Sequence, residues 1–480
     1  MKKGTFYLTI LSTVLFFVLS CTGNKGQGEA TVMTSAEIEI AFEATAKQYQ
    51  LLCSGCHGNQ IGAFVDREWK NGHSDSVLIH RISEGDEEDG MPSFKDAMSE
   101  EDIAKMAAYI NSSIEAGNLY EFKDRPDISS VFEAEKFSYK LDLVIGDLEI
   151  PWGMAFLPGG EMLITERSGK MYRLSADRKL TEIENVPASL NKGQGGLMDV
   201  ELHPEYEKNG MVYLSYSIFK EEDGKTVATT AISRAKLNGN SLEELELLFV
   251  ALPYSSKGQH FGCRLEFDKE GYLYFSVGDR GRRDENPQSL ENHCGKIHRI
   301  NDDGSIPDDN PFVGVEGAMP TIYSYGHRNP QGVIMHPETG EIWTHEHGPR
   351  GGDEINIIKP GRNYGWPLIS YGINYNGTIF TTDTEMEGME QPLHYWVPSI
   401  APCGMDFISS DKYPGWKGSL LVGSLRFQYL NRCEIVDGQV ASEELLLKNL
   451  GRVRNVKEGP DGFIYVAVEK PGRIFRLVPE

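Results

Sequence analysis

The sequence is poor in basic residues. It has 47 Lys and Arg residues against 71 Asp and Glu residues, which gives a formal net charge of -24. Such a surface repels nucleic acid and gains nothing from an anionic bilayer, so neither is expected to be bound through charge. Basic residues that cluster inside so acidic a chain therefore suggest a buried anionic ligand, although ordinary surface ion pairs are the simpler interpretation for most of them.

The apolar segment at the start of the chain is too short to favour a membrane span. Lys2 and Lys3 precede a mostly apolar run from Phe6 to Leu19, a pattern typical of an export signal. Val18-Leu19-Ser20-Cys21 resembles a bacterial lipobox, which implies cleavage before Cys21 and lipidation of this residue. We therefore expect a signal peptide over residues 1–20, a tether over 21–37, and a lipoprotein on the periplasmic face of a bacterial membrane, with the outer membrane favoured.

Cysteines are few, and the seven can be sorted by context. Cys21 is the expected lipid site, and Cys53 and Cys56 belong to the motif described next. Four remain: Cys263, Cys294, Cys403 and Cys433. In an oxidising compartment they could form disulfides with three possible pairings, and buried free thiols are an equally good interpretation.

Cys53-Ser54-Gly55-Cys56-His57 is a CxxCH motif, the attachment pattern of c-type haem. Two thioethers would fix the porphyrin, and His57 would bind the iron. Met91, in a Gly-Met-Pro loop, is the expected second ligand, and a Met/His pair raises the haem potential. Met98 and His80 are weaker alternatives.

Helical patterns flank this motif. The apolar spacing predicts a helix over 38–52, and Ser99 with Asp102 predicts a capped helix whose inner stripe contains Ile103, Met106, Ala107 and Ile110. The stretch resembles class I cytochrome c, so we expect a small all-α domain over residues 38–115, followed by a linker over 116–140 that is either a tether or a packed strap.

The chain after residue 141 repeats a unit of short strands and Gly-rich turns six times. Four-stranded sheets repeated in series predict an all-β six-bladed β-propeller over residues 141–480. The strand from Leu141 to Ile145 is expected to pair with the last blade and close the ring. Propellers carry function on the loops around the central channel, so the long inserts at 279–292 and 346–376 are where we expect the site.

Five motifs stand in order in this domain, namely Gly193-Gln194-Gly195-Gly196-Leu197, Gln259-His260-Phe261-Gly262, Tyr325-Gly326-His327-Arg328-Asn329-Pro330, Glu346-His347-Gly348-Pro349-Arg350-Gly351-Gly352-Asp353-Glu354 and Asn363-Tyr364-Gly365-Trp366-Pro367. Together they resemble the soluble PQQ-dependent aldose sugar and glucose dehydrogenase family, and the EHGPRGGDE and SYGINY segments are closer to the aldose sugar branch.

The resemblance implies site residues position by position. His260 would be the general base, and Arg328 would act with it on the reacting carbonyl of pyrroloquinoline quinone (PQQ). The other implied cofactor contacts are Gln194, Asn329, Tyr375, Arg426, Arg452 and Arg454. Calcium would be bound by Gly348 and Pro349 at the cofactor, and by Glu354 and Tyr364 at a structural position. Arg426 replaces a family Lys, and Asn374 replaces an Asp of the glucose branch.

The residue chemistry agrees with this interpretation. The guanidinium group of Arg can bind each carboxylate of a tricarboxylate quinone through two hydrogen bonds. A neutral His can accept a hydroxyl proton near pH 7. The expected function is oxidation of an aldose to its lactone with haem c, PQQ and calcium as cofactors, and electrons passed to a downstream respiratory acceptor. A calcium-dependent propeller hydrolase or lactonase, and a sugar-binding module without turnover, are the alternatives.

Overall fold

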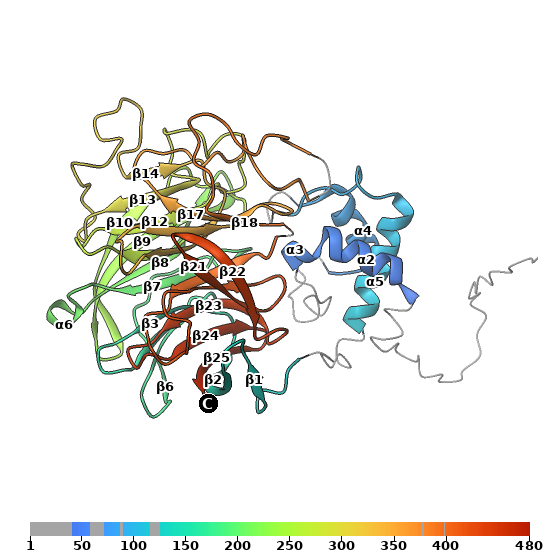
Figure 1. Ribbon diagram of the computed structural model, residues 1–480. Helices are drawn as coiled ribbons and strands as arrows, with labels where there is room; N and C mark the ends of the chain where they lie inside the picture. The colour runs from blue at the N-terminus through green and yellow to red at the C-terminus, as the bar shows by residue number, and fades with distance from the viewer. Residues whose placement is uncertain (1–40, 58–71, 87–89, 116–124, 376–378, 398) are drawn as a thin grey trace, which may run out of the picture.

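The protein is described from a computed structural model that places residues 41–57, 72–86, 90–115, 125–375, 379–397 and 399–480 (Figure 1). The expected signal peptide, lipid site and tether lie outside these residues. A small helical domain stands beside a large β-propeller (Figure 1). Among the described residues, no helix is long and apolar enough to cross a membrane.

The helical domain forms around the CxxCH motif. Its helices are α2 (Glu43–Leu52), α3 (Ser54–His57), α4 (Asp75–Glu84) and α5 (Glu100–Glu115). Ser99 caps α5 as predicted, because its Oγ accepts the Asp102 N–H at 3.1 Å. The predicted inner stripe of α5 is buried, and its members pack with residues of the other helices, namely Tyr49, Leu78, Ile82, Phe94 and Met98.

Six sheets make up the propeller, as predicted. Five have four strands in sequence order. Their strands are β3 (Pro151–Phe156), β4 (Met162–Glu166), β5 (Met171–Leu174) and β6 (Leu180–Glu182); β7 (Leu197–Leu202), β8 (Met211–Glu222), β9 (Lys225–Asn238) and β10 (Ser241–Val250), with the short helix α6 (Tyr206–Asn209) after β7; β11 (Leu265–Phe267), β12 (Leu273–Val277), β13 (Lys296–Ile300) and β14 (Ile322–Tyr325); β15 (Pro330–Met335), β16 (Ile342–Glu346), β17 (Asp353–Ile358) and β18 (His394–Trp396); and β19 (Pro402–Phe407), β20 (Leu420–Ser424), β21 (Leu430–Val436) and β22 (Gln439–Leu446).

The sixth sheet closes the ring. It joins β1 (Val131–Glu133) and β2 (Ser138–Leu148) to β25 (Gly472–Pro479), β24 (Ile464–Glu469) and β23 (Arg452–Glu458). The predicted closing strand lies in β2, where Leu141 pairs with Leu477 of β25. The start of the propeller therefore pairs with its end, and the short strand β1 rather than β25 forms the outer edge of this sheet (Figure 1).

The propeller begins before residue 141. β1 and the start of β2 fall in the segment assigned to the linker, and Ile128, Phe132 and Phe137 pack against the core of the last two blades. The described part of this segment is therefore a packed strap. The four remaining cysteines are buried free thiols, so the interpretation without disulfides is confirmed for Cys263, Cys294, Cys403 and Cys433.

The first strands of the blades surround the centre of the ring. β3, β7, β11, β15, β19 and β23 each contact the first strand of the next blade. Because strands within a blade are antiparallel, the loop that enters a first strand lies beside the end of the second strand. Most motif residues lie in these two sets of loops or in the adjoining ends of the strands. The motif that contains Tyr364 lies instead in the long connection between β17 and β18, which returns to this end of the ring, where the N–H of Tyr364 donates to the carbonyl of Tyr325 at 2.8 Å.

Candidate functional site

One cavity of about 1670 Å³ lies between the two domains. The helical domain contributes Cys53, His57 and Met91 to its lining, and the propeller contributes loops from around the ring. The predicted haem ligands and most of the predicted quinone contacts therefore face one shared space.

The wall on the helical side fits a haem. It is largely apolar, since Leu78, Ile82, Phe94, Met106 and Ile110 line it. His57 and Met91 line the same space and are the side chains that a Met/His iron site requires. The side chain of Cys56 lies outside the described residues.

The two weaker candidates for the second iron ligand are placed elsewhere. Met98 is 6% exposed and packs in the helical core, outside the cavity lining. His80 is exposed on α4 and does not line the cavity. The position of Met91 in the lining thus favours it over both.

His260 lies at the propeller end of the cavity and forms a pair with Asp279. The Nδ1 of His260 lies 2.6 Å from Oδ1 of Asp279. Burial lowers the pKa of His260, with Arg328 adding to the effect, and this outweighs the opposing influence of Asp279. Burial alone would raise the pKa of Asp279, but contacts with His260, Arg328 and Trp366 lower it. The stable state is a neutral imidazole beside a carboxylate, with Nδ1–H donating to Asp279 and Nε2 left as a proton acceptor.

The backbone around His260 is held by two predicted cofactor contacts. His260 adopts a left-handed conformation with a φ of 55°, which is strained for a residue with a side chain. Its N–H donates to Oε1 of Gln194 at 2.8 Å, and the N–H of Gly262 donates to Oδ1 of Asn329 at 3.1 Å. Gln194 and Asn329 therefore position the backbone around His260, and both also line the cavity.

Arg328 faces the cavity beside two aromatic rings. Its Nη1 donates to the carbonyl of His347 at 3.1 Å, and its Nη2 lies 3.4 Å from the hydroxyl of Tyr375. Its guanidinium carbon is 5.4 Å from the ring centre of Trp366. The arrangement brings together Arg328 and Tyr375, two of the residues that the resemblance implies as cofactor contacts.

Arg452 and Arg454 share one buried carboxylate. The Nε atoms of Arg452 and Arg454 donate to Glu469 at 3.2 Å and 2.5 Å. Burial would raise the pKa of Glu469, but these arginines and Arg167 hold it at about 2. Three guanidiniums thus lie close enough to one carboxylate to lower its pKa. A ligand with several carboxylates fits this part of the cavity.

Arg426 does not line the cavity among the described residues. Its Nη1 donates to the carbonyl of Ser399 at 3.1 Å, and its Nη2 donates to the carbonyl of Gln50 at 3.2 Å. The side chain therefore joins the propeller to the end of α2. Its predicted role at the cofactor stays a prediction.

The predicted structural calcium position has oxygen atoms suited to a cation. Glu346 and Glu354 are partners across β16 and β17, and burial together with the proximity of Glu346 raises the pKa of Glu354 to about 8. Oδ1 of Asn356, beside them, is buried without a hydrogen-bond partner. The hydroxyl of Tyr364 donates to the carbonyl of Ile357 at 2.6 Å and accepts the N–H of Lys359 at 2.9 Å, so it is already engaged, and use of the backbone carbonyl of Tyr364 by a metal stays a prediction.

No cluster of three His, Cys, Asp or Glu side chains suited to a metal occurs in the described parts of the chain. A calcium ion would therefore need amide or backbone oxygens as well. At the cofactor position, Pro349 lines the cavity, whereas the N–H of Gly348 donates to Asp353 at 2.8 Å. Asn374 lines the cavity too, and its Oδ1 accepts from Arg283 at 2.9 Å.

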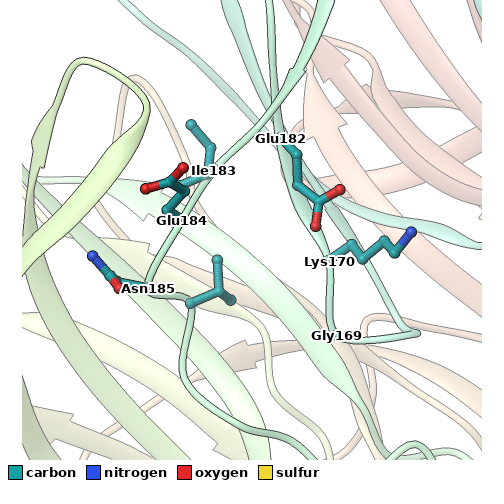
Figure 2. Close-up of a pocket in the computed structure, with 7 residues that line it drawn as sticks. Gly169, Lys170, Glu182, Ile183, Glu184 and Asn185 are labelled. Carbon is teal, nitrogen blue, oxygen red and sulfur yellow. The ribbon is translucent and has the colours of Figure 1, made fainter.

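Another hollow lies on the outer part of the first blade and has different chemistry. Figure 2 shows Lys170 and Glu182 on one side of it and Glu184 and Asn185 on the other. Of the residues that the structure describes, no His or Arg lines it, and its carboxylates would repel an anionic cofactor. The cavity between the domains is therefore the candidate active site.

Sequence reasoning did not single out Asp279, Glu469 or Arg167. Asp279 stands in one of the inserts predicted to carry the site, but among many charged neighbours. Arg452 and Glu469 are paired residues of β23 and β24, so a strand alignment could have joined them. Arg167 follows β4 at the same end of the ring and carries no motif.

Comparison with known proteins agrees with this arrangement. Residues 148–476 match the family model for glucose/sorbosone dehydrogenase, and residues 41–110 match the model for cytochrome c oxidase, cbb3-type, subunit III. The chain is 39% identical to aldose sugar dehydrogenase YliI of Escherichia coli over 73% of this chain and 96% of that protein. It is 31% identical to quinoprotein glucose dehydrogenase B of Acinetobacter calcoaceticus, over 78% of this chain and 94% of that protein.

Solved structures give the same result. The PQQ-bound form of aldose sugar dehydrogenase from Streptomyces coelicolor superposes with a TM-score of 0.58 at 27% identity, covering 72% of this chain and 100% of that chain. The family match spans nearly the whole propeller and leaves the helical domain to the cytochrome model. The chain belongs to the glucose/sorbosone dehydrogenase family and carries a cytochrome c domain ahead of its propeller.

Proposed function

We propose that the protein oxidises an aldose at its anomeric hydroxyl to the lactone, using PQQ and calcium, and passes the electrons to its own haem. The observation that carries this proposal is the shared cavity, which places the His260–Asp279 pair and the arginine cluster opposite His57 and Met91. A hydrolase would not need a haem pocket facing its active site.

His260 has the properties of the general base. Its neutral imidazole keeps Nε2 available to accept the proton of a sugar hydroxyl, while Asp279 orients the ring and stabilises the imidazolium once it forms. PQQ, when bound, supplies the carbonyl that accepts the hydride. Arg328, beside the same space, is positioned to hold an electron-rich oxygen through its guanidinium.

The positive wall would bind the carboxylates of the cofactor. Arg452, Arg454 and Arg167 exceed the single charge of Glu469, so added carboxylates would be attracted and bound by the guanidinium forks. Calcium would be held near Gly348 and Pro349, and at the position of Glu354 and Tyr364. These assignments rest on the motifs and on the oxygen-rich surroundings of Glu354 and Asn356.

Electrons would leave the protein through the haem. Sugar oxidation releases two electrons and a haem takes one at a time, so the haem is reduced twice per turnover and reoxidised by a respiratory acceptor. The lipobox-like segment ending at Cys21 supports a location at the periplasmic face of a bacterial membrane, with the outer membrane favoured.

Reconstitution tests the proposal. The purified haem-containing chain is mixed with PQQ and calcium, sugars are added, and haem reduction is followed by absorbance. We expect reduction by aldoses that needs both PQQ and calcium, with the lactone as product. Lactone hydrolysis without PQQ, or sugar binding without haem reduction, would contradict it.

A further inference from the structure

The helical domain touches the propeller with the side that carries the haem motif. Its contacts include Gly90, next to the expected iron ligand Met91, and Gln50, three residues before Cys53. A third contact comes from the propeller, because Tyr375 packs against the helical core. Gly90 and Tyr375 line the shared cavity, and Gln50 lies in the helix that leads to Cys53, so these contacts affect how the two cofactor pockets face each other.

Gly90 and Gln259 form the tightest of these contacts. Gly90 has a φ of +81°, and a Cβ atom built there would overlap Oε1 of Gln259 and lie 2.6 Å from its Cδ. The backbone before Met91 thus lies against the Gln259 side chain, and a methyl group at Gly90 would require this side chain to move. Since Gln259 precedes His260, only Gly90 and Gln259 separate the expected iron ligand from the proposed base along this line of contact.

Arg426 holds a second point of the interface. It bridges the carbonyl of Ser399 in the propeller and the carbonyl of Gln50 near the end of α2. The Oγ of Ser54 donates to the same Gln50 carbonyl at 2.6 Å. A cation is favourable at a helix C-terminus, where the carbonyls carry partial negative charge. The helix that leads into the haem motif is thereby tied to the propeller.

Tyr375 connects the two pockets. Its hydroxyl lies 3.4 Å from Nη2 of Arg328 in the propeller, while its ring packs against the helical core. Tyr375 lines the cavity, as do Arg328 and Met91. A change in the docking of the helical domain would therefore also change the surroundings of Arg328.

We propose that the cytochrome domain is docked in this one orientation, with Gly90 against Gln259, so that electrons pass directly from the quinone site to the haem within one chain. This inference rests on the proposed function and specifies its electron route. Each sugar loses two electrons and two protons. Each electron converts ferric haem to ferrous haem, and a one-electron acceptor protein reoxidises the haem twice per sugar.

A double-mutant cycle tests the contact. In the full-length holoenzyme, Gly90→Ala should slow haem reduction by sugar about tenfold, while turnover with a small dye that accepts electrons at the quinone changes little. Adding Gln259→Ala removes the overlapping Oε1 and Cδ atoms, so haem reduction should recover in part toward the rate of Gln259→Ala alone, while the strain of an alanine at a φ of +81° remains. Gly90→Ala without effect on haem reduction, or without rescue by Gln259→Ala, would overturn the proposal.

Gly85→Ala is the matched control. Gly85 also has a positive φ, of +78°, and its added Cβ would lie 2.6 Å from the carbonyl oxygen of Met91, inside the helical domain. It strains the same loop without touching the propeller, so Gln259→Ala should not rescue it. Equal rescue of both variants would contradict an effect at the interface.

A disulfide tests the docking without relying on activity. The added Cβ at Gly90 lies 3.2 Å from Cβ of Gln259, so a shift of a few tenths of an ångström brings the pair to the separation of about 3.5–4.5 Å that a disulfide requires. The pair Gly90→Cys with Gln259→Cys should therefore form a disulfide in the chain without PQQ, detected by peptide mapping. The pair Gly90→Cys with Leu245→Cys, an exposed position on β10, should not.

The two tests distinguish failure of the proposed docking from failure of the proposed function. If the disulfide forms but the wild type shows no PQQ-dependent dye reduction by sugars, the docking stands and the proposed function fails. If dye reduction occurs but neither the disulfide nor the rescue is found, the function stands and the fixed docking fails.

Discussion

Oδ1 of Asp279 lies 2.6 Å from Nδ1 of His260, and Oδ2 of the same carboxylate accepts the indole N–H of Trp366 at 2.9 Å. The N–H of Gly281 donates to Oδ1 of Asp279 at 2.7 Å. Asp279 is 1% exposed and is therefore fixed on three sides. It sets both the orientation and the tautomer of the imidazole, so the proposed base is a two-residue unit rather than a lone histidine.

Replacing Asp279 by Asn should reduce turnover strongly without unfolding the protein. The amide keeps the shape but can no longer hold the imidazolium by charge, and it does not fix Nδ1–H as the donor. We expect kcat to fall by about 10²–10⁴-fold, the range of general-base catalysis, with PQQ binding retained. Steady-state kinetics measure kcat, and a PQQ titration measures the affinity for the cofactor. Turnover within a fewfold of the wild type would show that Asp279 is not needed.

The pH dependence of kcat/KM should report His260. Its pKa lies below the usual value of about 6.5 because it is buried. The neutral ring is the active form, so activity persists as the pH falls to 6.5 and is lost only below the lowered pKa. Asp279 opposes this lowering, so Asp279→Asn should move the acid limb further down. An acid limb at pH 7 or above would contradict this assignment.

Much of this site was accessible from local sequence. The positions of His260, Arg328, Arg452 and Arg454 follow from motifs, because each motif fixes a loop or strand at the mouth of the propeller. The six blades and the closing strand also follow from local patterning of strands and turns. Short-range signals of this kind need no knowledge of how distant segments meet.

The features that the sequence did not predict depend on contacts between segments that are distant in the chain. Asp279 joins His260 across two loops, and Arg426 contacts Gln50 from 376 positions away. Neither Gly90 nor Gln259 has a residue type that signals an interface. The start of the propeller was placed too late because β1 and the first residues of β2 pack as a strap, and their mixed polarity resembles a linker.

Glu469→Gln should separate the stability of the empty site from cofactor affinity. The carboxylate offsets Arg452, Arg454 and Arg167, so its removal leaves buried positive charge uncompensated. We expect the free energy of unfolding without PQQ to fall by about 3 kcal/mol, and PQQ to restore more stability to the variant than to the wild type. Thermal melts with and without PQQ measure this.

Glu338→Gln is the control for this substitution. Glu338 stands at an exposed turn position away from the cavity lining, so the same change of charge there should leave both melts near those of the wild type. Equal melting shifts in the two variants would mean that the loss of one negative charge, rather than its place among the arginines, causes the effect.

Calcium should stabilise the protein through Glu354. In the wild type, calcium at about a hundredfold excess over its Kd should add about 2.7 kcal/mol to the free energy of unfolding, and a chelator should remove this gain. Glu354→Gln should lose most of the calcium effect because one of the two facing carboxylates is gone. Melting curves with calcium and with chelator give the comparison. A full calcium response in this variant would place the ion elsewhere.

Met91→Leu and Met98→Leu form a pair that tests the iron site. Met91 lines the cavity with His57, so its replacement should remove the sulfur ligand, change the absorption spectrum of the ferric haem and lower its potential. Met98 packs in the helical core, so its replacement should cost less than about 1.5 kcal/mol and leave spectrum and potential unchanged. Spectra, a redox titration and thermal melts distinguish the two. If Met98→Leu alters the spectrum while Met91→Leu does not, the axial ligand has been assigned to the wrong methionine, and the Gly90 loop would no longer carry it to the interface.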